Sequence, residues 1–206
     1  MELVEISVRI LDLLNETAIL EKLELCGRTA YKSENRITPG SAEKFIRTII
    51  KSGHDSVLEH VSISVKFICD RGITHELVRH RIASYTQEST RYVNYNKKGM
   101  TFIKPPFWTE DSKQYQTWLT TVAYCEAAYN ALIQAGAKPQ EARSVLPESL
   151  KTEIVATMNI REWRHVLSIR TKPDVHPQMR MMMLLLLKEF QNILPVLFGD
   201  INKLEG

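Results

Sequence analysis

Apolar residues at alternate positions mark two strands in the first third of the chain. Near the N-terminus Val4, Ile6, Val8 and Ile10 alternate with polar residues, and the same period recurs over residues 61–67. Successive side chains of a strand point to opposite faces of its sheet, so this alternation is typical of half-buried strands. The pattern predicts one strand over residues 4–10 and a second over residues 61–67.

Apolar residues at helical spacing predict helices in most of the remaining chain. Pro139 and Pro177 stand where the first turn of a helix tolerates proline. The expected helices are residues 17–27, a helix from residue 41 that Gly53 closes, a long helix with apolar residues over 115–133 that stops at Gly136, residues 160–170, and a buried apolar segment over residues 181–187.

Composition places the chain among globular proteins of mixed α and β structure. It has 206 residues, of which 44% are hydrophobic and 25% charged. No repeat, low-complexity tract or linker interrupts it, so we expect a single domain over residues 1–206. Because the net charge is only +3, any basic function must come from local clustering of charges.

Cysteine usage and the chain ends indicate a cytoplasmic protein. Cys26, Cys69 and Cys125 are odd in number and form no C-x-x-C pair, which fits a reducing compartment. The N-terminus lacks the basic start and apolar run of a signal peptide, and the apolar run at 181–187 is too short to span a bilayer. We therefore expect a cytoplasmic location and no membrane partner.

One segment, residues 79–92, concentrates basic and hydroxyl side chains. It holds three arginines, one histidine and two serines within fourteen residues. Guanidinium groups bind phosphate and carboxylate bidentately, so the segment reads as a site for a polyanionic ligand. The alternative is an ordinary solvated basic turn.

A second basic cluster follows downstream. On the expected helix over 160–170, Arg161, Arg164 or His165, and Arg170 fall on overlapping faces. A charge interaction at the helix C-terminus would explain Arg170 alone. It does not explain the others, so this cluster also predicts an anion-binding site, to which Arg143, Asn159 and His176 add polar groups.

The sequence contains no clear motif for a metal site or for a serine or cysteine nucleophile. His75 and His80 are five residues apart, so on a helix they diverge by about 140° and do not match the H-E-x-x-H zinc motif. Ser84 and Ser89 lack a G-x-S-x-G elbow, and no cysteine has an obvious cation beside it. We expect no metal site.

The basic segment resembles a known signature. The pattern R-H-R-x-x-S-x-x-x-x-S-x-R-Y over residues 79–92 is similar to that of flavin-dependent thymidylate synthases. The resemblance extends over most of the chain and includes Gly53-His54-Asp55-Ser56 with Glu59-His60, Arg143-Ser144-Val145-Leu146-Pro147, Asn159 with Arg161, Arg170 and His176.

The resemblance implies both a fold and a reaction. The fold would be α+β, with a central antiparallel or mixed sheet flanked by helices and no Rossmann glycine motif. The reaction would be methylation of dUMP to dTMP, with 5,10-methylenetetrahydrofolate as carbon donor and FAD, reduced by NADPH, as hydride source. The family's active sites lie between subunits of a homotetramer.

The resemblance also implies roles for individual residues. Arg170 would act catalytically by favouring ionisation of the uracil at N3, since a guanidinium stays protonated. FAD would meet Ser56, Arg79, His80, Arg81, Gln87, Asn159, Ile160, Arg161 and His165. The nucleotide dUMP would meet Glu76, Arg79, Gln87, Glu88, Ser89, Thr90, Arg91, Arg143 and Arg170.

Two other classes remain open at this point. A nucleic-acid-binding module would also interleave arginines with tyrosines, although a net charge of +3 is weak for that role and we expect no nucleic-acid partner. A non-catalytic flavin-binding protein would keep the FAD contacts but would not need Arg91, Arg143 and Arg170 together. The chain departs from commonly seen relatives at Glu76, Thr86, Gln87 and His165.

Overall fold

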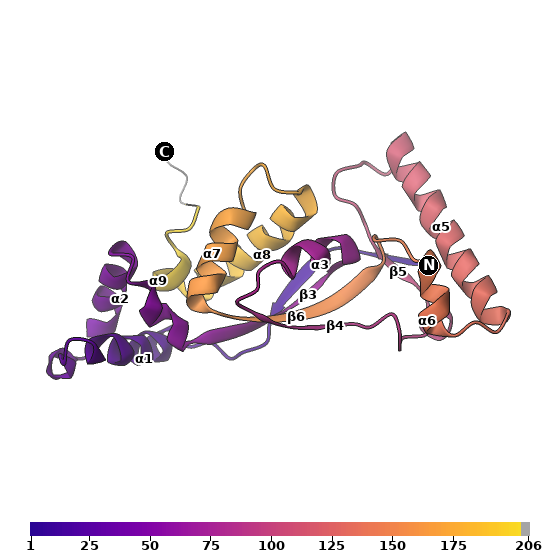
Figure 1. The fold of residues 1–206 in the computed structure, drawn as a ribbon. Coiled ribbons are helices and arrows are strands. Elements are labelled where there is room, and N and C mark those ends of the chain that lie inside the picture. Colours follow the sequence, from indigo (N-terminus) through magenta and orange to yellow (C-terminus); the bar gives the residue numbers. More distant parts are fainter. Residues whose placement is uncertain (203–206) are drawn as a thin grey trace.

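The protein is elongated, with a central sheet between two groups of helices. The computed structural model describes residues 1–202. Figure 1 shows α1 (Glu16–Thr29) and α2 (Ser41–Lys51) at one end and α5 (Lys113–Gln134) at the other. The predicted α+β class is confirmed.

A four-stranded antiparallel sheet forms the centre. Its strand order is β2 (Ser7–Ile10), β3 (Ser62–Asp70), β6 (Lys151–Asn159) and β4 (Ser84–Gln87). β3 and β6 pair along their whole length, from Ser62 opposite Asn159 to Asp70 opposite Lys151. The strand expected over residues 61–67 is therefore confirmed. β6 was not predicted, although its buried and half-buried residues alternate just as clearly.

The single strand expected over residues 4–10 is wrong. The segment forms two strands in different sheets, because β1 (Glu2–Val4) pairs in parallel with β5 (Thr101–Ile103) while β2 pairs with β3. Ile6 lies between them and is buried in the main core. An alternating pattern reports which side chains are buried, but the pairing partner of each half is set by the tertiary structure.

Three helices cover one face of the sheet. They are α3 (Arg71–Leu77), α7 (Ile160–Arg170) and α8 (Pro177–Ile193), and Figure 1 shows them together on the same side. The sheet residues that face them are buried and apolar, namely Ile63, Val65, Phe67, Ile154, Ala156 and Met158. Residues of the alternate set, such as Lys66 and Glu153, are only half-buried.

Trp163 anchors α7 to this sheet. The side chain is fully buried and its Nε1 donates a hydrogen bond of 2.9 Å to the carbonyl of Ile63. Its ring centroid lies 6.2 Å from that of Phe67 on β3 and 5.8 Å from that of Phe190 on α8. One residue thus joins a strand and two helices.

The expected helices near the N-terminus are confirmed with slightly different bounds. α1 begins after Asn15, whose side chain accepts from the backbone N–H of Ala18 at 3.0 Å. α2 begins after Gly40, which has a φ of 81° that favours glycine. These helices pack with η1 (Glu34–Arg36), η2 (Asp55–His60) and α9 (Pro195–Phe198) at this end of the molecule.

The opposite end has its own small apolar cluster. α5 ends before Gly136, as predicted, and Gly136 has a φ of 93°. α4 (Tyr95–Lys98), α6 (Pro139–Ala142) and η3 (Arg143–Val145) lie nearby. The cluster consists of Tyr95, Met100, Phe102, Val122, Tyr129, Ala142 and Leu150.

The helix over residues 181–187 is confirmed as part of α8, but only one side of it is buried. Met182, Met183, Leu186 and Leu187 face the core, whereas Leu185 is 37% exposed. Within residues 1–202, no helix combines the length and apolar character needed to cross a bilayer.

Replacing Trp163 by phenylalanine should lower the free energy of unfolding by about 1–3 kcal/mol, because it removes the hydrogen bond to Ile63 and leaves a void. Urea denaturation measures the change. The matched control is Trp108→Phe, since Trp108 is 36% exposed; it should change stability by less than about 0.5 kcal/mol. Equal losses in the two variants would contradict the anchoring role of Trp163.

Candidate active site

The turn that carries Arg79, His80 and Arg81 is held against the sheet by a tyrosine. It follows α3 and leads into β4. The hydroxyl of Tyr85 donates to the carbonyl oxygens of Leu77 and His80, both at 2.8 Å. Burial raises the pKa of Tyr85 to about 12, so the phenol remains a donor at neutral pH.

Side chains of this turn point in different directions. His80 is only 8% exposed, whereas Arg79 and Arg81 are exposed and the neighbouring Ile82 is 67% exposed. The two arginines are available to an external ligand. The histidine faces the protein interior.

Arg170, the last residue of α7, reaches this turn. Its Nε donates to Nε2 of His80 at 3.0 Å, and its Nη1 donates to Oε2 of Glu76 at 3.1 Å. A longer contact of 3.5 Å joins its Nη2 to the backbone carbonyl of Glu76. Residues that are 90 and 94 positions apart in the sequence therefore meet at one guanidinium group.

His80 is neutral in this arrangement. Burial, together with the nearby charges of Arg170 and His165, lowers the pKa of His80 to about 4. The carboxylate of Glu162, which is also buried, lies 3.9 Å from Nδ1 of the ring. Because Nε2 accepts a hydrogen bond from Arg170, the ring proton is on Nδ1.

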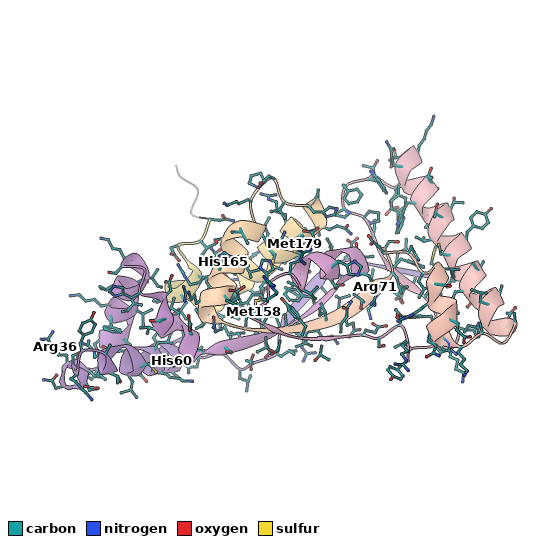
Figure 2. All side chains as sticks on the ribbon, in the orientation of Figure 1. Arg36, His60, Arg71, Met158, His165 and Met179 are labelled. Atoms are coloured by element: carbon teal, nitrogen blue, oxygen red, sulfur yellow. The ribbon has the colours of Figure 1, made fainter. Side chains whose placement is uncertain are left out.

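A second part of the site is a pocket of about 840 Å³ beside α7. Asn159 begins the helix and its side-chain oxygen accepts from the backbone N–H of Glu162 at 2.8 Å. Arg161 pairs with Glu59 at 2.5 Å. Figure 2 marks His165 on α7. The pocket is lined by Asp55, Glu59, Ile82, Asn159, Arg161, Glu162, Arg164, His165, Ser168, Asp200, Ile201 and Asn202.

Four residues expected to contact FAD lie close to this pocket or line it. Asn159, Arg161 and His165 line it directly, and Ser56 belongs to η2, which also supplies Asp55 and Glu59. The lining mixes acidic and basic groups. Any phosphate that binds there must compete with Glu59 for Arg161.

A third group lies beyond the other end of β4. Nη1 of Arg143 donates to the hydroxyl of Thr90 at 3.4 Å, and Nε of Arg91 donates to the side-chain oxygen of Gln140 at 3.2 Å. Both arginines are exposed. Thr90 is buried.

Glu88 and Gln87 hold this end of β4 in place. Glu88 accepts from the hydroxyl of Tyr95 at 2.9 Å and from Nζ of Lys151 at 3.2 Å. The amide of Gln87 donates to the hydroxyls of Thr74 at 3.0 Å and Thr152 at 3.3 Å. A pocket of about 630 Å³ beside them is lined by Lys66, Thr86, Gln87, Glu88, Val93, Tyr95, Gly99, Thr101, Lys151, Glu153 and Val155.

The residues expected at dUMP therefore fall into two groups. Glu76 and Arg170 meet near one end of β4, with Arg79 in the turn that precedes the strand, whereas Glu88, Ser89, Thr90, Arg91 and Arg143 lie past the other end. Within residues 1–202, no hydrogen bond or ion pair links a side chain of the first group to one of the second. Gln87 lies between them on β4.

Sequence reasoning missed the residues that support these groups. Glu162, Tyr85 and Lys151 have polar contacts at the site, yet none was assigned a role in it. Glu162 stands three residues after the helix-capping Asn159, which is the one local signal that could have drawn attention to it. Its approach to His80 is a tertiary contact.

Metal-binding and thiol chemistry are not prominent in the part of the chain that the structure describes. There, no group of three or more His, Cys, Asp or Glu side chains is arranged to hold a metal ion. Burial raises the pKa of the Cys69 thiol strongly, which disfavours the reactive thiolate.

The low pKa of His80 makes stability depend on pH. The unfolded histidine takes up a proton near pH 6.5, whereas the folded one stays neutral to about pH 4. The neutral ring therefore contributes stability fully above pH 6.5, and this contribution is lost as pH falls to about 4. Relative to His80→Gln, the wild-type protein should lose at most about 3 kcal/mol of unfolding free energy over this interval.

Urea denaturation between pH 4 and pH 7 measures that difference. The matched control is His75→Gln, which removes an exposed histidine of the adjacent helix α3. A stability difference between wild type and His80→Gln that does not change with pH would contradict the assignment of a neutral ring.

Comparison with known proteins identifies the family of this chain. The family model for the thymidylate synthase complementing protein matches residues 12–196. The flavin-dependent thymidylate synthase of Pyrococcus furiosus is 37% identical over 147 residues, which cover 70% of this chain and 60% of that protein. The enzyme of the same name from Geobacter sulfurreducens is 32% identical over 188 residues, covering 90% and 81%.

A solved structure shares the fold. The UMP/dUMP methylase PolB from Streptomyces cacaoi, bound with 5-Br dUMP, superposes with a TM-score of 0.79 at 26% identity, covering 97% of this chain and 96% of that one. This chain spans less than two thirds of the length of the two Pyrococcus relatives: 60% of the P. furiosus enzyme and 57% of the flavin-dependent thymidylate synthase of Pyrococcus horikoshii. Sequence and fold together show that the chain belongs to the thymidylate synthase complementing protein family, whose matched relatives are flavin-dependent thymidylate synthases.

Proposed function

We propose that the protein methylates dUMP to dTMP. A methylene group from 5,10-methylenetetrahydrofolate replaces the hydrogen at C5 of the uracil, which leaves as a proton, and a hydride completes the methyl group while tetrahydrofolate is released. Bound FAD, reduced by NADPH, supplies that hydride. The observation that carries the proposal is the placement of Arg170 between His80 and Glu76.

Arg170 suits the ionisation of a uracil ring. Its guanidinium stays protonated and is partly buried, so it stabilises a negative charge on the ring more than an exposed arginine would. An anionic uracil is electron-rich at C5. That carbon then attacks the methylene group without a cysteine nucleophile, in keeping with the buried, protonated thiol of Cys69.

The residues near α7 fit a flavin cofactor. The exposed Arg79 and Arg81 and the pocket residue Arg161 offer three guanidinium groups to a diphosphate. The side chains of Asn159, His165 and Ser56 add hydrogen-bonding groups, and Ile160 adds its backbone. Gln87 would join them where the cofactor extends along β4. The chain has no G-x-G-x-x-G motif, so binding does not use a Rossmann loop.

The two groups of nucleotide residues support a site shared between subunits. Arg170, Glu76 and Arg79 would come from one chain, and Arg91 and Arg143 from another. The exposed guanidinium groups of Arg91 and Arg143 suit the phosphate of dUMP, with Glu88, Ser89 and Thr90 beside them. We propose a homotetramer of single-domain chains in the cytoplasm, where the three free cysteines remain reduced.

Release of tritium from C5-labelled dUMP tests the reaction directly. The label should be released only when the folate, NADPH and FAD are all present. A protein that binds FAD without releasing tritium would be a non-catalytic flavoprotein. Salt-dependent binding of nucleic acid with no flavin affinity would instead identify a nucleic-acid-binding module.

The variant Arg170→Ala should keep FAD but lower kcat/KM for dUMP by about 10- to 150-fold, which corresponds to the loss of about 1.5–3 kcal/mol. Flavin absorbance and dTMP formation measure the two properties. The control is Arg47→Ala, which removes an exposed arginine that pairs with Glu43 on α2. Unchanged turnover in Arg170→Ala would contradict the proposed role.

Mixed oligomers test whether the site is shared. Arg170→Ala and Arg143→Ala should each have strongly reduced activity alone, and mixing them by co-expression should raise the activity. If Arg170 and Arg143 of one site come from different chains, random mixing rebuilds about a quarter of the sites. If both come from the same chain, no mixed oligomer contains an intact site and activity stays low.

A further inference from the structure

We propose that His80, oriented by Glu162, is a positioning residue that sets the orientation of the Arg170 guanidinium. The inference deepens the proposed function and rests on it for its catalytic consequence. It differs from the expectation that His80 contacts FAD. Four buried or half-buried side chains carry this role: Glu76 of α3, His80 of the following turn, and Glu162 and Arg170 of α7.

Arg170 needs such a partner because it lies at the end of a helix. Its side chain leaves the last turn of α7 and has several rotatable bonds. The Nε–H donates to His80 on one side, and Nη1 donates to Glu76 on the other. Since the guanidinium is planar, these two hydrogen bonds define the plane of the group.

The same contacts leave donors free for a ligand. A guanidinium has five N–H groups. Three of them donate here, to Nε2 of His80, to Oε2 of Glu76 and to the backbone carbonyl of Glu76. One N–H on Nη1 and one on Nη2 remain. His80 thus fixes the plane through Nε and leaves the two terminal nitrogens to meet the uracil.

Glu162 keeps His80 in the tautomer that this task requires. The ring accepts from Arg170 only if Nε2 carries no proton, so the proton must be on Nδ1. The carboxylate of Glu162 lies 3.9 Å from Nδ1 and favours a proton there. The backbone N–H of Glu162 donates to the side-chain oxygen of Asn159, which fixes the backbone from which this carboxylate extends.

One ring nitrogen of His80, Nε2, is therefore engaged by Arg170, and the other, Nδ1, faces the Glu162 carboxylate at 3.9 Å. The side chain is 8% exposed, in contrast to Arg79 and Arg81 on either side of it. A ring that is mostly buried and whose Nε2 already accepts from Arg170 is better placed to orient that guanidinium than to bind a cofactor. The alternation of exposed and buried residues in Arg79-His80-Arg81 separates ligand binding from positioning.

A double-mutant cycle tests whether His80 acts through Arg170. His80→Phe should lower kcat/KM for dUMP by at least about tenfold in wild-type protein but by less than about twofold in Arg170→Ala. His80→Gln supplies an oxygen that accepts from Nε, and it should recover most of the loss. FAD affinity, measured by flavin fluorescence, should change by less than about threefold in His80→Phe.

Several outcomes would overturn the inference. The first is a loss of FAD affinity of tenfold or more in His80→Phe. The second is a loss of kcat/KM from His80→Phe that is as large in the Arg170→Ala background as in the wild-type background. The third is a kcat/KM of His80→Phe equal to that of the wild-type protein. His75→Gln on α3 is the matched control and should leave kcat/KM unchanged. If His80→Phe does not fold, Glu162→Gln replaces it in the cycle because it preserves the ring and the side-chain size.

The tautomer provides a readout that does not depend on activity. The ¹⁵N spectrum of labelled histidine should show His80 with its proton on Nδ1 at pH 7, and Arg170→Ala should shift the Nε2 signal. A proton on Nε2 would refute the positioning role even in an active enzyme. An inactive wild-type protein with the expected tautomer would refute the proposed function and leave the His80–Arg170 contact standing.

Discussion

The nine-residue ladder between β3 and β6 determines where the functional side chains meet. α3 follows β3 directly at the Asp70–Lys151 end of the ladder, and α7 follows β6 directly at the Ser62–Asn159 end. The strands are antiparallel, so the two helices start from opposite ends of the sheet and run back over the same face. The segment after α3 and the end of α7 meet above the middle of the sheet, which brings Arg170 to Glu76 and His80.

Local hydrogen bonds fix the start of each helix. Asp70 accepts from the backbone N–H of Ile73 at 2.8 Å and from the amide of Gln178 at 2.8 Å, so it ties α3 to α8 as well. Asn159 has the same capping role for α7. Trp163 then holds α7 on β3 through one hydrogen bond and one aromatic contact, and a second aromatic contact joins it to Phe190 of α8. The position of the Arg170 side chain follows from these contacts.

The polar groups that contact Arg170 stabilise its positive charge, and its guanidinium stays protonated. Glu76 provides one negative charge at a half-exposed position, while His80 provides a neutral acceptor. A second cation at His80 would repel the guanidinium. Burial and the neighbouring charges keep the histidine neutral, so it adds no second positive charge beside the Arg170 guanidinium that an anionic ring would approach.

The sequence by itself determined several elements of this protein and its family. Hydrophobic periods identified β3, α1, α2, α5, α7 and α8, and the arginine-rich segments predicted anion binding and identified the family. Only the tertiary structure decided that the run over residues 4–10 serves two sheets, that β6 lies at the centre, and that the contiguous segment 79–92 is split by β4 into separate places. It also decided that His80 faces Arg170 and Glu162. Periodicity records which side chains are buried, because it follows from local backbone geometry, whereas strand partners and contacts across 90 residues depend on how the whole chain packs.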